Sequence, residues 1–145
     1  MYNYKYVEQC EVSIQQQEVT TIKERLLPYT PKLSVVIPVL NRAHESPRLF
    51  ESLKTQEYNG DLEIIIADAG STDGSIELAQ NAGYRVVPVP TESGIGATRQ
   101  AGCESATGEI IINTDSDCSW PPNYLSVVAN TFSDPEVIAS YGPVE

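Results

Sequence analysis

The sequence predicts an α/β fold in which helices cover both faces of a mainly parallel sheet. Short apolar runs, typical of buried strands, alternate four times with segments that have helical spacing. Polar and glycine residues follow each of these runs. Strand–helix–strand units place successive strands in parallel, and ligands bind such sheets beyond the carboxyl ends of the strands. The pattern therefore predicts one sheet with one polar, ligand-binding edge.

The first predicted strand is the nearly continuous apolar run Leu33–Ile37. Ser46 then supplies an N-cap for a helix, and Pro47 suits its first turn because proline lacks an N–H that would stay unpaired there. Apolar side chains of this helix recur at Leu49, Phe50 and Leu53. The second predicted strand, residues 62–67, has three consecutive isoleucines at its centre.

The remaining elements continue the same alternation. Further strands are predicted at 84–89, 109–114 and 137–141. Further helices are predicted between the turn at 71–74 and Gly83, over 94–106, and from Pro121 onward. The helix over 94–106 is rich in small side chains, which permits close packing. An uncovered edge beyond the strand at 137–141 favours pairing with a second copy, and so a homo-oligomer.

The length of 145 residues suits one domain, predicted at 31–145, preceded by an N-terminal extension at 1–30. A short helix is expected within the extension at 20–27. The sequence has no apolar run of the roughly 18 residues that a transmembrane segment needs, and its start does not resemble a secretory leader. The cysteines match no zinc spacing and indicate thiols of a reducing compartment. A cytoplasmic location is therefore expected.

The chain is strongly acidic, with a formal net charge of -11. This charge argues against nucleic acid as a partner, because nucleic-acid affinity depends on Lys and Arg at phosphates. It also argues against docking on an anionic membrane. An acidic protein repels an anionic ligand, so binding needs a local source of positive charge such as a bound cation or a well-placed arginine.

Two carboxylates, Asp115 and Asp117, flank Ser116 directly after a buried apolar run. At this spacing both can share one hard cation, whose remaining oxygen ligands would come from a diphosphate and water. The alternative is a solvated acidic turn. Asp68 ends the second strand in the same way and can accept hydrogen bonds from a ribose hydroxyl or a base N–H. It can instead cap a turn, as we expect of Asp73.

Arg99 lies one turn into the small-residue helix, where it can bind phosphate oxygens or form an ordinary salt bridge. A dinucleotide-binding domain is a rival interpretation, since Gly94 and Gly96 open a helix and Asp115 follows about 20 residues later. Arg99 occupies the position where that fingerprint needs a small residue. A non-catalytic binding module is a further alternative.

Residues 33–42 resemble the opening strand of the family 2 glycosyltransferases, which have the GT-A fold. Residues 68–75 are similar to the Asp-Asp-Gly-Ser-Thr-Asp-Gly turn of that family. Residues 93–102 are similar to its Gly-x-x-x-Ala-Arg-Asn-x-Gly helix, and residues 115–117 fall where its D-x-D (DXD) motif falls. The matches occur in order across 33–143.

This resemblance implies a Rossmann-like sheet of the GT-A type and a transferase that binds a nucleoside-diphosphate sugar, with a UDP-sugar favoured, through Mn²⁺ or Mg²⁺. The implied donor-binding residues are Pro38, Asn41, Asp68, Arg99, Asp115 and Ser116. The implied metal ligands are Asp117 and Asp115. Ala69 departs from the acidic or amide residue that is usual beside Asp68.

In family 2 the acceptor side and the catalytic base follow the point at which this sequence ends. Transfer with inversion needs that base to deprotonate the acceptor hydroxyl. The catalytic residue and the acceptor therefore stay unassigned. Either the sequence is a truncated GT-A domain, or a partner supplies the base, or the protein binds the donor without completing the transfer.

Overall fold

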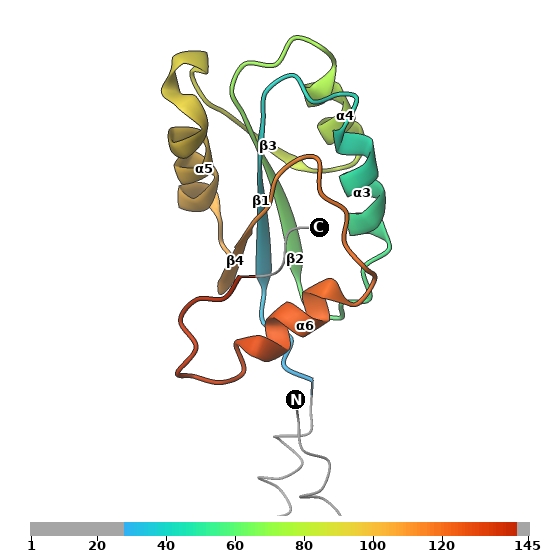
Figure 1. Ribbon diagram of the computed structural model, residues 1–145, viewed down its shortest axis with the longest axis vertical. Coiled ribbons are helices and arrows are strands. Elements are labelled where there is room, and N and C mark those ends of the chain that lie inside the picture. Colours follow the sequence, from blue (N-terminus) through green and yellow to red (C-terminus); the bar gives the residue numbers. More distant parts are fainter. Residues whose placement is uncertain (1–27, 142–145) are drawn as a thin grey trace, which may run out of the picture.

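The computed structural model describes residues 28–141. The expected helix at 20–27 and most of the expected extension lie outside these residues. Strands and helices alternate along the described chain (Figure 1). In order they are β1 (Leu33–Val39), α3 (Ser46–Lys54), β2 (Leu62–Asp68), α4 (Ser75–Asn81), β3 (Arg85–Pro88), the 3-10 turn η1 (Thr91–Ser93), α5 (Gly94–Ser105), β4 (Ile110–Asn113) and α6 (Tyr124–Thr131).

The strands form one parallel sheet in the order β3-β2-β1-β4, which confirms the predicted α/β architecture. Val36 in the middle of β1 lies opposite Ile65 on one side and Asn113 on the other. Successive strands are added in one direction from β1 to β3, and β4 is then added on the opposite side of β1. The order of the sheet therefore reverses between β1 and β4, which is the place where open α/β sheets bind ligands.

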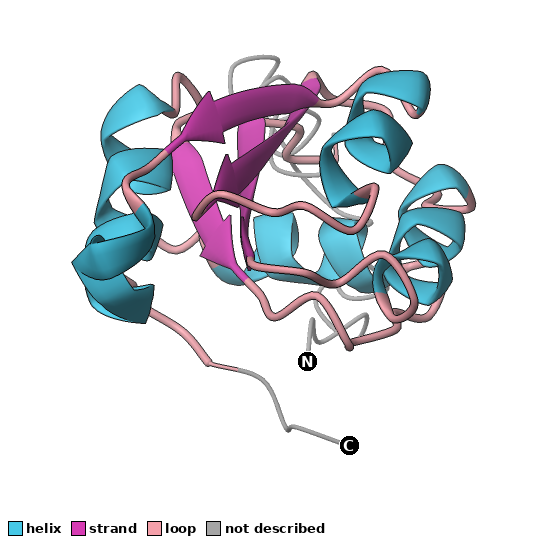
Figure 2. Cartoon of the chain, turned by 90° about the horizontal axis from the view of Figure 1, so that it is seen from above, coloured by secondary structure: helices cyan, strands magenta, loops and turns pink. Residues whose placement is uncertain are grey.

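The main core lies between one face of the sheet and the helices α3, α4 and α6. Alternate residues of β1 point to this face, as expected of a strand. The buried members of the core are Leu33, Val35, Ile37, Val39, Leu49, Phe50, Leu53, Ile66, Ala79, Ile110, Ile112 and Leu125. Figure 2 shows the sheet enclosed between its helices when the molecule is seen from above.

Helix α5 covers the opposite face of the sheet (Figure 1). Its closest approach is at Gly102, where an added Cβ would collide with the Val36 side chain and lie 3.3 Å from the Ala67 Cβ. The small residues predicted for this helix therefore allow it to lie directly on β1 and β2.

A polar cluster joins β1, β2 and the start of β4 at the amino ends of the strands. One Glu63 carboxylate oxygen accepts hydrogen bonds from the Ser34 hydroxyl (2.5 Å) and from the Thr107 backbone N–H (2.5 Å) and hydroxyl (2.8 Å). Burial alone would raise the pKa of Glu63, but these hydrogen bonds and the charge of Lys32 lower it to about 2. The cluster holds the amino ends of the strands together, at the end of the sheet opposite the carboxyl ends where ligand binding is predicted.

Two local predictions are wrong. Residues 137–141 form no strand: the Val137 N–H donates to Asp134 in a turn, and Ile138 and Tyr141 are 92% and 98% exposed. These side chains bury no surface that would fix them in an extended strand, and the edge expected there is absent. Ser46 is not an N-cap, because α3 includes it and Glu45 takes the cap position. No helix among residues 28–141 is long and apolar enough to cross a membrane.

Candidate functional site

A pocket of about 470 Å³ lies at the carboxyl ends of the strands, beside the reversal between β1 and β4. Its volume is within the range of about 300–1,000 Å³ that is typical of small-ligand sites. All the strand ends, or the segments that follow them, contribute to its wall, as the sequence predicts. The lining residues are Pro38, Val39, Leu40, Arg42, Ala69, Thr91, Gly94, Ile95, Thr98, Asp115, Ser116 and Asp117.

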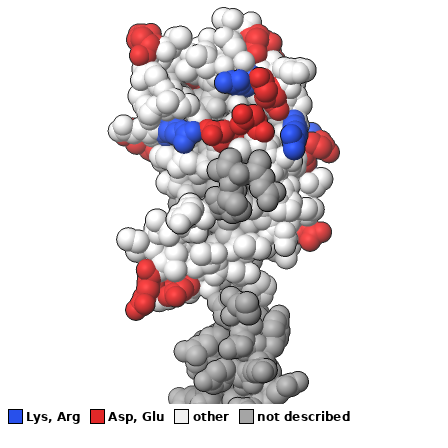
Figure 3. Space-filling view, viewed as in Figure 1, with Lys and Arg blue, Asp and Glu red and all other residues white. Residues whose placement is uncertain are grey.

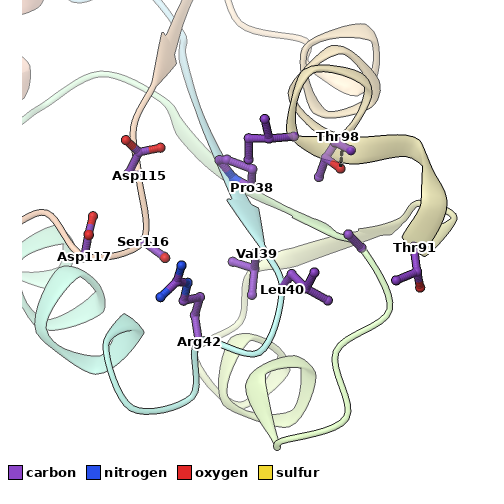
Figure 4. A pocket seen from close by; sticks show the side chains of 12 residues that line it. Pro38, Val39, Leu40, Arg42, Thr91, Thr98, Asp115, Ser116 and Asp117 are labelled. Carbon is purple, nitrogen blue, oxygen red and sulfur yellow. Dashed lines mark hydrogen bonds between the residues drawn. The ribbon is translucent and has the colours of Figure 1, made fainter.

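The two ends of this pocket differ in charge (Figure 4). At one end lie residues 115–117 and the side chain of Arg42, which extends towards Ser116. At the other end lie Thr91 and Thr98, which are uncharged. A ligand with one charged and one neutral part would match this division.

The wall formed after β1 is held by hydrogen bonds from the turn after β2. Asn41 has a positive φ of 53°, and its side-chain carbonyl accepts from the Thr72 N–H at 2.9 Å. The Ala43 N–H donates to the Asp73 carboxylate, also at 2.9 Å. The Ser75 hydroxyl and backbone N–H donate hydrogen bonds to the Asp73 carboxylate, and these lower the pKa of Asp73. Asn41 and Asp73 therefore position the pocket wall, and neither is among the pocket-lining residues.

Asp68 is buried at the end of β2, immediately before the pocket residue Ala69. Its Oδ2 accepts hydrogen bonds from the N–H groups of Gly70 and Ser71, both at 2.9 Å. Its Oδ1 is buried without a hydrogen-bond partner. An unpaired buried carboxylate oxygen is costly, and Asp68 Oδ1 is an acceptor that the described residues leave unused.

The segment after β4 carries the acid pair. Asp115 accepts a hydrogen bond from Arg99 of α5 and forms an ion pair with it. Ser116 is buried, whereas Asp117 is exposed. Among the described residues, the Asp117 carboxylate has neither a hydrogen-bond nor an ion-pair partner. Asp117 is therefore the acid of this pair that is free to bind a ligand.

Arg42 is the cation of the pocket wall. Its guanidinium lies 3.2 Å from Glu45 in an exposed ion pair, which contributes little to stability and leaves other donors of the guanidinium available. On the face shown in Figure 3, basic side chains lie beside acidic ones rather than forming a wide basic surface. Positive charge is therefore local, as expected of an acidic protein that binds a small anion.

The structure brings four of the predicted site residues to the pocket wall: Pro38, Asp115, Ser116 and Asp117. Three others, Asn41, Asp68 and Arg99, lie behind the wall and contact the loops that form it. The sequence did not single out Arg42, Thr91, Ile95 and Thr98 as site residues, although they line the pocket. Arg42 and Thr91 lie in strand-end segments whose importance was predicted, and Ile95 and Thr98 lie in α5, but only the packing shows which side chains face inward.

The two carboxylates provide hard oxygen ligands of the kind that Mn²⁺ and Mg²⁺ prefer. No group of three or more His, Cys, Asp or Glu side chains among residues 28–141 is arranged to hold a metal. The donor set fits a cation that takes its other ligands from a bound diphosphate and water, as is usual for Mg²⁺ at phosphate sites.

The sequence model of Glycosyl transferase family 2 matches residues 34–145. The chain therefore belongs to glycosyltransferase family 2, in agreement with its fold and with the order of its motifs. Membership of this family argues against the rival dinucleotide-binding interpretation.

Individual proteins agree with this assignment. An uncharacterised glycosyltransferase of Nostoc sp. is 33% identical over 112 residues, which are 74% of this chain and 34% of that protein. The structure of S. aureus TarS with UDP-GlcNAc superposes with a TM-score of 0.64 at 26% identity, over 71% of this chain and 31% of that one.

A mannosyltransferase of Pyrobaculum calidifontis, in complex with GDP-Man and Mn²⁺, gives a TM-score of 0.62 at 25% identity. It is matched over 76% of this chain and 34% of its own. The chain thus spans about a third of the length of these proteins.

Proposed function

We propose that this chain forms the donor site of a glycosyltransferase that binds a nucleoside-diphosphate sugar through Mn²⁺ or Mg²⁺ and transfers the sugar, with inversion, to an acceptor. The observation that carries the proposal is the unpaired Asp117 carboxylate at the charged end of a divided pocket. Support also comes from the UDP-GlcNAc and GDP-Man complexes of the two structural neighbours.

The pocket suggests how the donor would lie. The diphosphate would occupy the end formed by Arg42, Asp115 and Asp117, where the guanidinium can bind phosphate oxygens. The nucleoside would occupy the neutral end beside Thr91. Asp68 Oδ1 would accept a hydrogen bond from a ribose hydroxyl or a base N–H, which would satisfy its unpaired oxygen.

In the proposed transfer, an acceptor hydroxyl gives its proton to a base and attacks the anomeric carbon, while the bond from that carbon to the diphosphate oxygen breaks and the nucleoside diphosphate leaves. A bound divalent cation would offset the negative charge that builds up on the leaving diphosphate. Asp117, with the free oxygen of Asp115, would hold the cation, and Arg42 would stabilise the same charge by hydrogen bonding. We assign the catalytic base to none of the described residues.

Isothermal titration with UDP, GDP and dTDP, each with and without MnCl₂, tests the proposal directly. We expect UDP to bind only with the metal, and Asp117→Asn to abolish this binding while leaving the fold intact. Asp134→Asn is the matched control, because Asp134 is exposed and lies well beyond Asp117 in the sequence. Equal UDP affinity with and without metal, or unchanged binding by Asp117→Asn, would contradict the proposal.

We also propose that the protein acts in the cytoplasm. Cys103 and Cys118 are free thiols in the structure, as expected in a reducing compartment. Cell fractionation with a C-terminal tag tests this, and recovery in a secreted fraction would contradict it.

A further inference from the structure

Residues 115–122, here called the acidic segment, are bound to the rest of the protein at both ends. At the first end Arg99 of α5 pairs with Asp115. At the second end the carbonyls of Pro121 and Pro122 accept hydrogen bonds from residues 56 and 57, which follow α3. In Figure 1 the chain between β4 and α6 crosses the carboxyl ends of the strands and descends beside α3. The two attachments therefore come from α5 on one face of the sheet and from the segment that follows α3 on the other face.

The Gln56 side chain makes the central contact at the second end. Its Nε2 donates to the Pro121 carbonyl at 2.8 Å and to the Ser52 carbonyl of α3 at 3.1 Å. Its Oε1 accepts from the Leu125 N–H at the start of α6 at 3.0 Å. Only an amide supplies donors and an acceptor in this way, so neither a carboxylate nor an aliphatic side chain can replace it.

Two hydrogen bonds beside Gln56 would remain if its side chain were changed. The Glu57 N–H donates to the Pro122 carbonyl at 2.7 Å, and the Ser126 hydroxyl donates to the Glu57 carbonyl at 2.5 Å. Gln56 is itself only partly buried. Substitution of Gln56 is therefore expected to loosen the end of the acidic segment without unfolding the domain.

The acidic segment connects Asp117 to this attachment. Asp117 makes no hydrogen bond or ion pair of its own among the described residues. It precedes Pro121 by four residues, so a fixed Pro121 limits it to within ~14 Å even for a fully extended chain. The fixed φ angles of Pro121 and Pro122 further restrict the segment. The Cys118 N–H donates to the Asp115 carbonyl at 3.4 Å and closes a turn around Asp117, and a displaced Pro121 carbonyl would leave this turn less firmly held.

We propose that Gln56 is a positioning residue for the acid pair: by holding Pro121 it keeps Asp117 where one cation can contact both Asp117 and Asp115. The inference rests on the function proposed above. Gln56 itself is not among the residues that line the pocket.

The single tryptophan of the sequence, Trp120, reports on this segment directly. It lies between Asp117 and Pro121 and stacks on Tyr124, with ring centroids 4.5 Å apart. Its fluorescence is followed while MnCl₂ is titrated into the protein with UDP, and the MnCl₂ concentration at half-maximal change is compared between variants. The variants are Gln56→Leu and Gln56→Glu, with Gln80→Leu on the exposed face of α4 as the matched control.

We expect both Gln56 variants to need about tenfold more MnCl₂, as is typical when a residue that orients a metal ligand is lost. Saturating MnCl₂ should restore UDP binding, and Gln80→Leu should match the wild type. A purely structural role would lower the melting temperature but leave the MnCl₂ midpoint of the folded protein unchanged, and that result would overturn the inference. If the wild type itself shows no metal-dependent response, the proposed function fails first, and this inference fails with it.

Discussion

Arg99 of α5 donates a hydrogen bond to the Asp115 carboxylate beyond β4, and so joins a helix on one face of the sheet to the acidic segment. The bond occupies one oxygen of Asp115 and offsets its charge. Asp117, two residues later, has no such partner among the described residues. The two acids are thus unequal: Asp115 is oriented by an arginine, and the Asp117 carboxylate has no such partner among the described residues.

The Arg99–Asp115 pair should contribute little to stability. The two side chains are 40% and 59% exposed, so water screens their attraction. A double-mutant cycle with Arg99→Met and Asp115→Asn should give a coupling energy of about 0.2–1 kcal/mol in urea unfolding. The coupling should shrink in high salt, and a value that stays large in salt would show that the pair has a structural role.

Arg42→Met should weaken UDP binding by about tenfold and leave uridine binding unchanged, since the guanidinium would contact only the diphosphate. Parallel titrations with UDP and uridine measure the difference. Arg48→Met, on an exposed position of α3 outside the pocket wall, is the matched control. An equal loss for both ligands would place Arg42 beside the nucleoside instead.

Glu63→Gln should flatten the dependence of stability on pH. The folded-state pKa of Glu63 is lowered from its ordinary value of 4.5 to about 2. The ionised Glu63 therefore contributes its full stabilisation of the folded state above the unfolded-state pKa, and this stabilisation is lost as the pH falls towards 2. Urea unfolding between about pH 6 and pH 2.5 should show a smaller loss in Glu63→Gln than in the wild type. The exposed Glu136→Gln should behave like the wild type.

Gly102→Ala should destabilise the protein by about 1–3 kcal/mol, because the new methyl group would collide with buried Val36. Gly96→Ala on the same helix meets nothing within 4 Å. That variant should gain up to about 1 kcal/mol from helix propensity. Urea unfolding of the two variants separates the packing of α5 from its intrinsic helix stability, and equal effects would exclude close packing at Gly102.

The alternation of apolar runs was enough to predict the sheet, because β1 and β2 are buried on both faces and therefore read as continuous hydrophobic segments. The same signal failed at 137–141. An apolar run forms a strand only when it can bury its side chains and pair its backbone, and Ile138 does neither. Hydrophobicity alone contains no information about the neighbour that a strand needs.

The location of the pocket was predictable from the strand ends, but the individual roles of its residues were not. Arg99 and Asp115 were both expected at the site, and their spacing in the sequence left open whether the arginine would bind phosphate or the acid. The structure pairs them. Gln56 carried no sequence signal, because its importance arises from carbonyls of residues 52 and 121, which meet only after folding.

The polar cluster around Glu63 and the ligand pocket lie at opposite ends of the same strands. Substitutions in the pocket can therefore accumulate without directly disturbing the Glu63 cluster, and substitutions in the cluster without directly changing the pocket. Randomised libraries restricted to pocket positions such as Leu40, Thr91 and Ile95 should retain a high fraction of folded members. Under the proposed function, such a division would let descendants of one scaffold diverge in the sugars they accept, and the domain would then be a practical starting point for altering donor preference by selection.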